Sequence, residues 1–162
     1  MRHAHTDQFP KQSIWGMIGL TIITLTFYFP FWLRKHTRIV NRILPDAAIA
    51  SWWFPVCIMV TALNFGMVIP EIITNDDPGV MLLSKIVEKI DIILTIVWTF
   101  KIRNRMNTIL AAQPKQPQWY HGFWTFVFGV FYLQYKVNEL NTATENVEQP
   151  AEELQSESAL SD

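Results

Sequence analysis

The chain has 162 residues, of which 50% are hydrophobic and only 17% are charged, and its formal net charge is −1. Ordinary soluble domains carry roughly 25% charged residues, so the apolar surplus predicts a protein that places hydrophobic segments in a bilayer. The single cysteine, Cys57, excludes an internal disulfide and a metal site built on paired thiolates.

Four segments have about the length that a bilayer requires, which is roughly 20 mostly apolar residues for a hydrocarbon slab of roughly 30 Å. Aromatic side chains gather at the ends of these segments, as they do at membrane interfaces. The predicted spans are about 14–33, 52–73, 79–100 and 119–135. The sequence therefore predicts an all-α, integral membrane four-helix bundle over residues 13–141. The alternative is three spans plus an interfacial helix, because 119–135 is the shortest segment.

Both ends of the chain differ in composition from this region. Residues 1–12 are expected to form a flexible N-terminus. From residue 142 to 162 the chain loses its aromatic residues and fills with Glu, Ser, Ala and Gln. Such a segment buries too little apolar area to offset its ordering entropy, so we expect a disordered acidic tail.

Proline residues inside two of these segments predict local kinks. Pro30 and Pro55 each remove one helix hydrogen bond if they lie in a helix interior. Ordinary bending is the favoured interpretation, and a gating hinge is the alternative.

The distribution of basic residues predicts the orientation. The two loops 34–51 and 101–118 hold eight of the thirteen Lys and Arg residues, whereas the turn between the second and third segments has Asp76 and Asp77. Basic loops favour the cytoplasmic side. We therefore expect both basic loops in the cytoplasm of a multi-pass protein and the acidic turn outside. Four spans would place both termini outside, and three spans would leave the C-terminus in the cytoplasm.

Three of the segments end in the same way, with an aromatic residue followed nine positions later by asparagine. The three pairs are Trp32 and Asn41, Trp98 and Asn107, and Tyr132 and Asn141. Two interpretations are open: a real internal repeat, or coincidence in an aromatic-rich chain. In the first, the ring anchors a helix at the interface and asparagine ends that helix, because it tolerates the left-handed cap.

Residues 24–32 read Thr-Leu-Thr-Phe-Tyr-Phe-Pro-Phe-Trp, and residues 138–141 read Asn-Glu-Leu-Asn. They resemble a family of small bacterial multi-pass membrane proteins known only as a domain of unknown function. Its members tend to show Thr-x-Gly-Ile-Tyr-x-x-Tyr-Trp near a span end, followed by basic residues and Glu-Leu-Asn. Thr26 stands where that family has glycine. The resemblance implies an uncharacterised protein of the bacterial inner membrane and assigns no catalytic residue.

The third segment carries charges within a run that otherwise looks membrane-spanning. At about 100° per residue, its polar side chains fall largely on one helix face. Four charges facing lipid would cost roughly 10–14 kcal/mol, so this face is expected to avoid lipid. It is either a packed seam with a Lys85–Glu88 pair or a path for an ion or polar solute. The predicted polar face consists of Lys85, Glu88, Lys89, Asp91, Thr95 and Thr99.

The stretch 31–43 mixes apolar and basic residues. This pattern suits an interfacial helix that binds anionic lipid headgroups, and a plain stop signal on the cytoplasmic side explains it equally well. The residues predicted at the headgroups are Trp32, Arg34, Lys35, Arg38 and Arg42.

The pattern of polar residues assigns no catalytic group, cofactor or metal. His36 and His121 have no metal-ligand spacing to another ligand. We expect a non-enzymatic inner-membrane protein with an accessory, assembly or stress-related role. The alternative is a small transporter or channel subunit that uses the polar face of the third segment. The expected partners are the lipid bilayer, anionic lipid, and a second copy or a larger membrane complex, and no nucleic acid.

Overall fold

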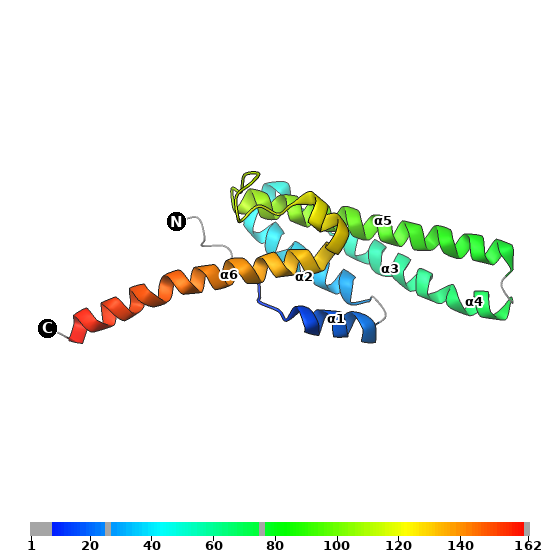
Figure 1. The fold of residues 1–162 in the computed structure, drawn as a ribbon. Helices are drawn as coiled ribbons and strands as arrows, with labels where there is room; N and C mark the ends of the chain where they lie inside the picture. The colour runs from blue at the N-terminus through cyan, green and yellow to red at the C-terminus, as the bar shows by residue number, and fades with distance from the viewer. Residues whose placement is uncertain (1–7, 25–26, 75–76, 161–162) are drawn as a thin grey trace.

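The computed structural model describes residues 8–24, 27–74 and 77–160, with side chains in the last range up to residue 143. Every regular element in these residues is helical, which confirms the all-α prediction (Figure 1). The elements are α1 (Ile14–Ile23), α2 (Tyr28–Ile43), the 3-10 turn η1 (Pro45–Ala47), α3 (Trp53–Gly66), α4 (Val68–Ile73), α5 (Pro78–Ile109) and α6 (Gly122–Leu160).

The first predicted span, 14–33, is not one helix. The hydroxyl of Thr24 donates to the Leu20 carbonyl at 2.7 Å and accepts the Tyr28 N–H at 3.1 Å, so this residue serves the end of α1 and the start of α2. The Tyr28 hydroxyl donates to Gln12 Oε1 at 3.2 Å, which brings the start of α2 back to the segment before α1. The ten residues of α1 rise only about 15 Å, half of a bilayer core.

Neither of the two prolines predicted to kink a helix lies in a helix interior. Pro30 and Pro55 occupy the third positions of α2 and α3. The N–H groups of the first turn have no partner within their own helix, so proline costs little there. The predicted kinks at these positions are therefore wrong.

The second and third predicted segments form a long helical hairpin. Among the described residues, Trp53–Ile73 is the one helical stretch that is long and apolar enough to cross a membrane, by length and composition. It divides into α3 and α4 because Pro70 has no N–H for the carbonyl of Gly66, four residues earlier. α5 packs against α3 and α4 and has 32 residues, a rise of about 48 Å (Figure 1).

The fourth predicted span, 119–135, is broken at Gly129. This residue has φ 52° and ψ −128°, which separates residues 122–128 from the rest of α6. Such a conformation is accessible to glycine because it has no Cβ. The first part of α6 rises only about 10 Å before the chain turns. The four expected spans are therefore replaced by one long hairpin flanked by two short ones.

The two ends of the chain also differ from expectation. Residues 8–12, expected as part of a flexible N-terminus, are packed, and Phe9 is buried. Residues 1–7 lie outside the described residues. Residues 142–160, expected within a disordered acidic tail, continue α6 as a helix that projects from the bundle (Figure 1). Glu, Gln, Ala and Leu are good helix formers, which favours this local structure.

The fold is a set of three similar units, which we number in chain order as unit 1 (residues 8–43), unit 2 (48–109) and unit 3 (119–143). Each unit has a short non-helical segment with a buried apolar residue, an outgoing helix, a turn and a returning helix. The outgoing helices are α1, α3 with α4, and residues 122–128 of α6. The returning helices are α2, α5, and α6 from Val130 onward.

The three returning helices pack against one another and build the core. Trp32 of α2 and Trp98 of α5 are among its largest fully buried side chains. The Trp32 indole N–H donates to Gln134 of α6 at 3.0 Å, and that of Trp98 donates to Thr37 of α2 at 2.8 Å. Each indole therefore buries its ring and still satisfies its donor on a neighbouring helix.

We predict that Gly129→Ala destabilises the protein. A methyl group added there would meet no atom within 4 Å, so the cost comes from the backbone conformation, about 1–3 kcal/mol. Gly19→Ala is the matched control, because Gly19 is helical and equally open, and alanine there is expected to stabilise by up to about 1 kcal/mol. Thermal unfolding in detergent measures both. Equal melting temperatures for the two variants would contradict the prediction.

Candidate functional site

Two asparagine side chains each bind the backbone of a single residue through a pair of hydrogen bonds. Asn41 Nδ2 donates to the Ile49 carbonyl at 2.8 Å, and Asn41 Oδ1 accepts the Ile49 N–H at 2.7 Å. Asn107 makes the same two bonds with Tyr120, at 3.2 and 2.8 Å. A primary amide has a donor and an acceptor side by side, as a peptide group requires. We call each such pair an amide clamp.

The third asparagine of the repeat, Asn141, binds the N-terminal segment through one hydrogen bond, and its Oδ1 has no partner among the described residues. Asn141 Nδ2 donates to the carbonyl of Phe9 at 2.8 Å. One helical turn earlier, Asn138 makes both clamp bonds with the backbone of Gln12, at 2.6 and 3.1 Å. Gln134 Nε2 adds a bond to the Pro10 carbonyl at 3.0 Å. Three amides along α6 thus bind one non-helical stretch of backbone.

The clamps join the units into a closed ring. The asparagine of unit 1 binds the non-helical segment of unit 2, that of unit 2 binds unit 3, and that of unit 3 returns to unit 1. The aromatic–asparagine pattern in the sequence therefore marks a structural repeat. Its interpretation as a helix cap is wrong, because Asn41 and Asn107 lie two residues before the ends of their helices and Asn141 lies inside α6.

We predict that Asn41→Ala costs about 2–3 kcal/mol of stability. It removes both partners of the Ile49 peptide groups, and a buried polar group without a partner costs about 1–3 kcal/mol. Asn104→Ala is the control, because Asn104 is exposed and binds no backbone outside its own helix among the described contacts. Chemical unfolding of both variants in the same detergent gives the comparison, and a loss as large for Asn104→Ala would rule out the clamp.

His36 is buried where α2 meets the N-terminal segment. Its ring stacks on Trp32 at 3.7 Å and on Phe9 at 5.9 Å, measured between ring centroids. Its Nδ1 lies 3.0 Å from the Trp32 carbonyl, which can only accept, so Nδ1 carries the proton. Burial, with a smaller effect from the charge of Lys35, lowers the pKa of His36 to about 4. The ring is therefore neutral at physiological pH.

We predict that the free energy of unfolding falls by about 3 kcal/mol between pH 6.5 and pH 4. The folded-state pKa of His36 is about 4 and the unfolded value is 6.5, so the unfolded state binds the proton first and gains stability as the pH falls. His36→Phe should flatten this dependence. His121→Gln, a change at an exposed histidine, should preserve it. An unchanged slope in His36→Phe would exclude this origin.

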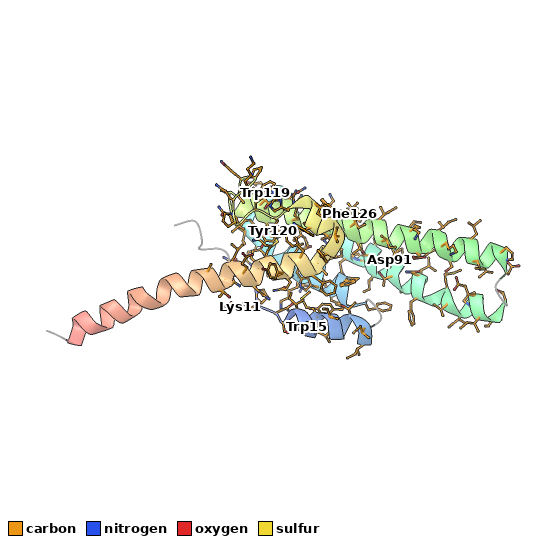
Figure 2. The ribbon with its side chains drawn as sticks, in the orientation of Figure 1. Lys11, Trp15, Asp91, Trp119, Tyr120 and Phe126 are labelled. Carbon is orange, nitrogen blue, oxygen red and sulfur yellow. The ribbon has the colours of Figure 1, made fainter. Side chains whose placement is uncertain are left out.

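The predicted polar face of α5 is divided in the structure. Asp91 faces α3 (Figure 2), where its carboxylate accepts the Thr61 hydroxyl at 2.8 Å and the Asn64 amide at 3.3 Å. Thr99 is buried, and its hydroxyl donates to the carbonyl of Thr95 on the same helix. Asp91 and Thr99 therefore take part in packing within the chain, and half-buried Thr95 contributes its main-chain carbonyl.

The other three residues of that face lie outside the packing. Lys85 and Lys89 are exposed and Glu88 is half-buried. Glu88 pairs with Lys89 at 3.4 Å, in place of the expected Lys85–Glu88 pair. The sequence periodicity grouped all six residues, but Asp91 lies far enough round the helix to meet α3, whereas Lys85, Glu88 and Lys89 do not.

The predicted headgroup residues on α2 also divide into two groups. Trp32 is only 2% exposed and belongs to the core, so its assignment to the interface is wrong. Lys35, Arg38 and Arg42 are exposed, as a headgroup role requires. Arg34 is half-buried, with its guanidinium 4.2 Å from the centroid of Phe54.

Cations on α5 extend this basic region. Lys101 lies 5.3 Å from the Trp53 ring and Arg103 lies 5.0 Å from the Trp119 ring. Arg103 also donates to the Tyr120 carbonyl at 2.6 Å, and Arg105 donates to the Ala47 carbonyl at 2.7 Å. We call the cations of α2 and α5 at this end of the bundle the basic collar: Arg34, Lys35, Arg38, Arg42, Lys101, Arg103 and Arg105. The sequence showed how many cations these segments contain, but it did not show the backbone and aromatic groups that they contact.

A comparison with known families identifies the domain that holds most of these features. Residues 12–108 match the family described as Domain of unknown function (DUF4234). The chain belongs to this family. The DUF4234 match covers most of unit 1 and nearly all of unit 2, including Asn41 and Asn107, and leaves unit 3 outside it. Membership in an uncharacterised family, as expected from the sequence, is confirmed. No curated protein and no solved structure matches the chain.

Proposed function

We propose that the chain is a non-enzymatic protein of the bacterial inner membrane with an accessory or assembly role. The long hairpin of unit 2 crosses the bilayer, and the short hairpins of units 1 and 3 enter one leaflet only. The basic collar lies at the cytoplasmic headgroups, where it binds anionic lipid. The observation that carries this proposal is the exposed apolar surface of the long hairpin.

Among the described residues, no other part of the chain covers that surface. Within the most apolar window of Trp53–Ile73, only 17% of the residues are buried. Apolar residues also lie exposed along α5, on the same hairpin. The large exposed hydrophobic residues on the helices of the hairpin are Met59, Leu63, Phe65, Val68, Ile69, Ile72, Ile73, Leu82, Leu83, Ile86, Ile90, Ile92, Ile93 and Val97. A continuous apolar surface of this extent marks contact with a membrane or a partner.

The tips of the short hairpins are apolar and aromatic as well. At the end of α1, next to the turn, Ile22 and Ile23 are 70% and 78% exposed. Phe126 in the first part of α6 is 62% exposed, and Trp15, at the start of α1, is 82% exposed (Figure 2). Backbone inside a bilayer must satisfy its own hydrogen bonds, and the hydroxyl of Thr24 does so at the tip of unit 1. This arrangement supports entry of both hairpins into the cytoplasmic leaflet.

The charges support one orientation of the whole molecule. The basic collar lies at the end of the bundle where the three units begin and finish (Figure 1). Asp77 caps the start of α5, at the opposite end of the long hairpin. Basic residues favour the cytoplasm. In this topology both termini are cytoplasmic, whereas four full spans would have placed them outside. The projecting part of α6 then carries the acidic C-terminal segment away from the membrane, towards a soluble or membrane-bound partner.

The alternative role as a transporter or channel subunit gains no support from the polar residues of α5. Asp91 is engaged by α3, and Lys85 and Lys89 lie on the outside of the hairpin. These side chains do not line a common path through one copy of the chain. The contacts of Asp91 instead favour its role as a polar link between two membrane helices.

Cysteine labelling tests the topology. In a Cys57→Ser background, we expect Asp76→Cys to react with a membrane-impermeant thiol reagent added outside intact spheroplasts. Asp46→Cys and Ser158→Cys should react only after the membrane is permeabilised. Reaction of Ser158→Cys from outside would support four full spans and contradict the proposal. Release of the protein from membranes by alkaline carbonate would contradict membrane insertion itself.

A further inference from the structure

We propose that two copies of this chain associate in the membrane through the face of α5 that carries Glu88 and Lys89. In this dimer, Glu88 of each copy pairs with Lys89 of the other. The inference rests on the proposed membrane insertion of the long hairpin, and it names the partner that the hairpin requires.

The face lies on the side of α5 opposite α3. With Lys85 set at 0° and about 100° per residue, Val87 and Asp91 lie at about 200° and 240°. These two positions mark the α3 side, because Val87 is buried and Asp91 is bonded to Thr61. Glu88 and Lys89 lie at about 300° and 40°, on either side of Lys85. Their shared face therefore points away from α3.

Units 1 and 3 do not reach this part of the hairpin. Their outgoing helices rise about 15 and 10 Å, whereas α5 rises about 48 Å. Figure 1 shows α4 and the first half of α5 extending well beyond α1 and beyond the turn in α6. The side chains of Lys89 and Glu88 accordingly remain 68% and 46% exposed.

Lipid is an unfavourable environment for these two side chains. A charged residue at the centre of a membrane helix makes insertion less favourable unless it faces other polar groups. Glu88 and Lys89 lie about 15 Å from the start of α5, close to the middle of a bilayer core of roughly 30 Å. Their ion pair within the chain, at 3.4 Å, lowers the free-energy cost of placing the charges in lipid but leaves both groups facing the lipid. A protein surface with complementary charges removes that exposure.

A second copy supplies this complement. Glu88 and Lys89 are consecutive, so they lie at nearly the same depth and flank a line at about 350° on the helix. A twofold axis normal to the membrane, next to the 350° side of each α5, relates the two copies. It places Glu88 of each copy opposite Lys89 of the other, so that two intermolecular pairs form. Ile92, exposed at about 340°, adds an apolar contact one turn further along. Lys85 lies one turn nearer the outer surface, and its long side chain can reach the headgroups.

Charge exchange tests the reciprocal pairing. Fluorescent donor and acceptor copies are reconstituted in vesicles of phosphatidylcholine and phosphatidylglycerol, and energy transfer reports association. Wild-type copies should associate. Glu88→Lys copies present two cations and Lys89→Glu copies two anions, so each variant alone should associate at least tenfold more weakly. Mixed together, the two variants should recover wild-type association, because each supplies the charge that the other lacks.

The control is Lys115→Glu, which reverses an exposed charge in the loop 110–121 and should leave association unchanged. Wild-type copies that remain monomeric, single variants that associate as wild type does, or a mixture that fails to recover would each overturn the dimer. Recovery in the mixture also excludes a pairing confined to one chain, because neither copy regains its own pair. Failure of membrane insertion would appear separately, in the labelling of Asp76→Cys.

Discussion

The fold depends on one interaction: a side-chain amide that replaces the missing hydrogen-bond partner of a peptide group. The segments around Phe9, Ile49 and Tyr120 enter the core without belonging to a helix or a strand. Their backbone polar groups would be costly there without partners. The asparagines of the returning helices supply those partners and so fix where each unit begins. The outgoing helices differ about threefold in length between units, yet the asparagines bind the first segment of every unit at the same end of the bundle.

Much of the architecture could be predicted from the sequence, but the role of its key residues could not. The spacing of Trp32 and Asn41, which recurs in two other aromatic–asparagine pairs, indicated a repeat. The partner of each asparagine is backbone, which leaves no residue-specific signal in a sequence. Trp32 looked like an interfacial ring because basic residues follow it. Its spacing from His36 and Val40, four and eight residues on, is the signal that places it on the buried face.

The break in two of the predicted spans has a similar explanation. Length and hydropathy cannot distinguish a helix that crosses from a pair of short helices that turn back. Gly129, in the middle of an apolar run, was a detectable cue. Thr24 was not, because threonine is common inside membrane helices and its hydroxyl can bond the carbonyl four residues earlier. In the resulting hairpins, all three returning helices end at the same end of the bundle.

The closure of the ring also determines the order in which the units can dock during synthesis. Asn141 and Phe9 are separated by 132 positions, and the bond between them joins nearly the first described residue to the end of the bundle. During synthesis, the segment around Phe9 in unit 1 gains its partner only after unit 3 has been made. Units 1 and 2 can dock as they emerge, since the Asn41 clamp links neighbours in the chain. Burial of Phe9 and His36 is therefore a late event, and the core is complete only after Asn141 has been made.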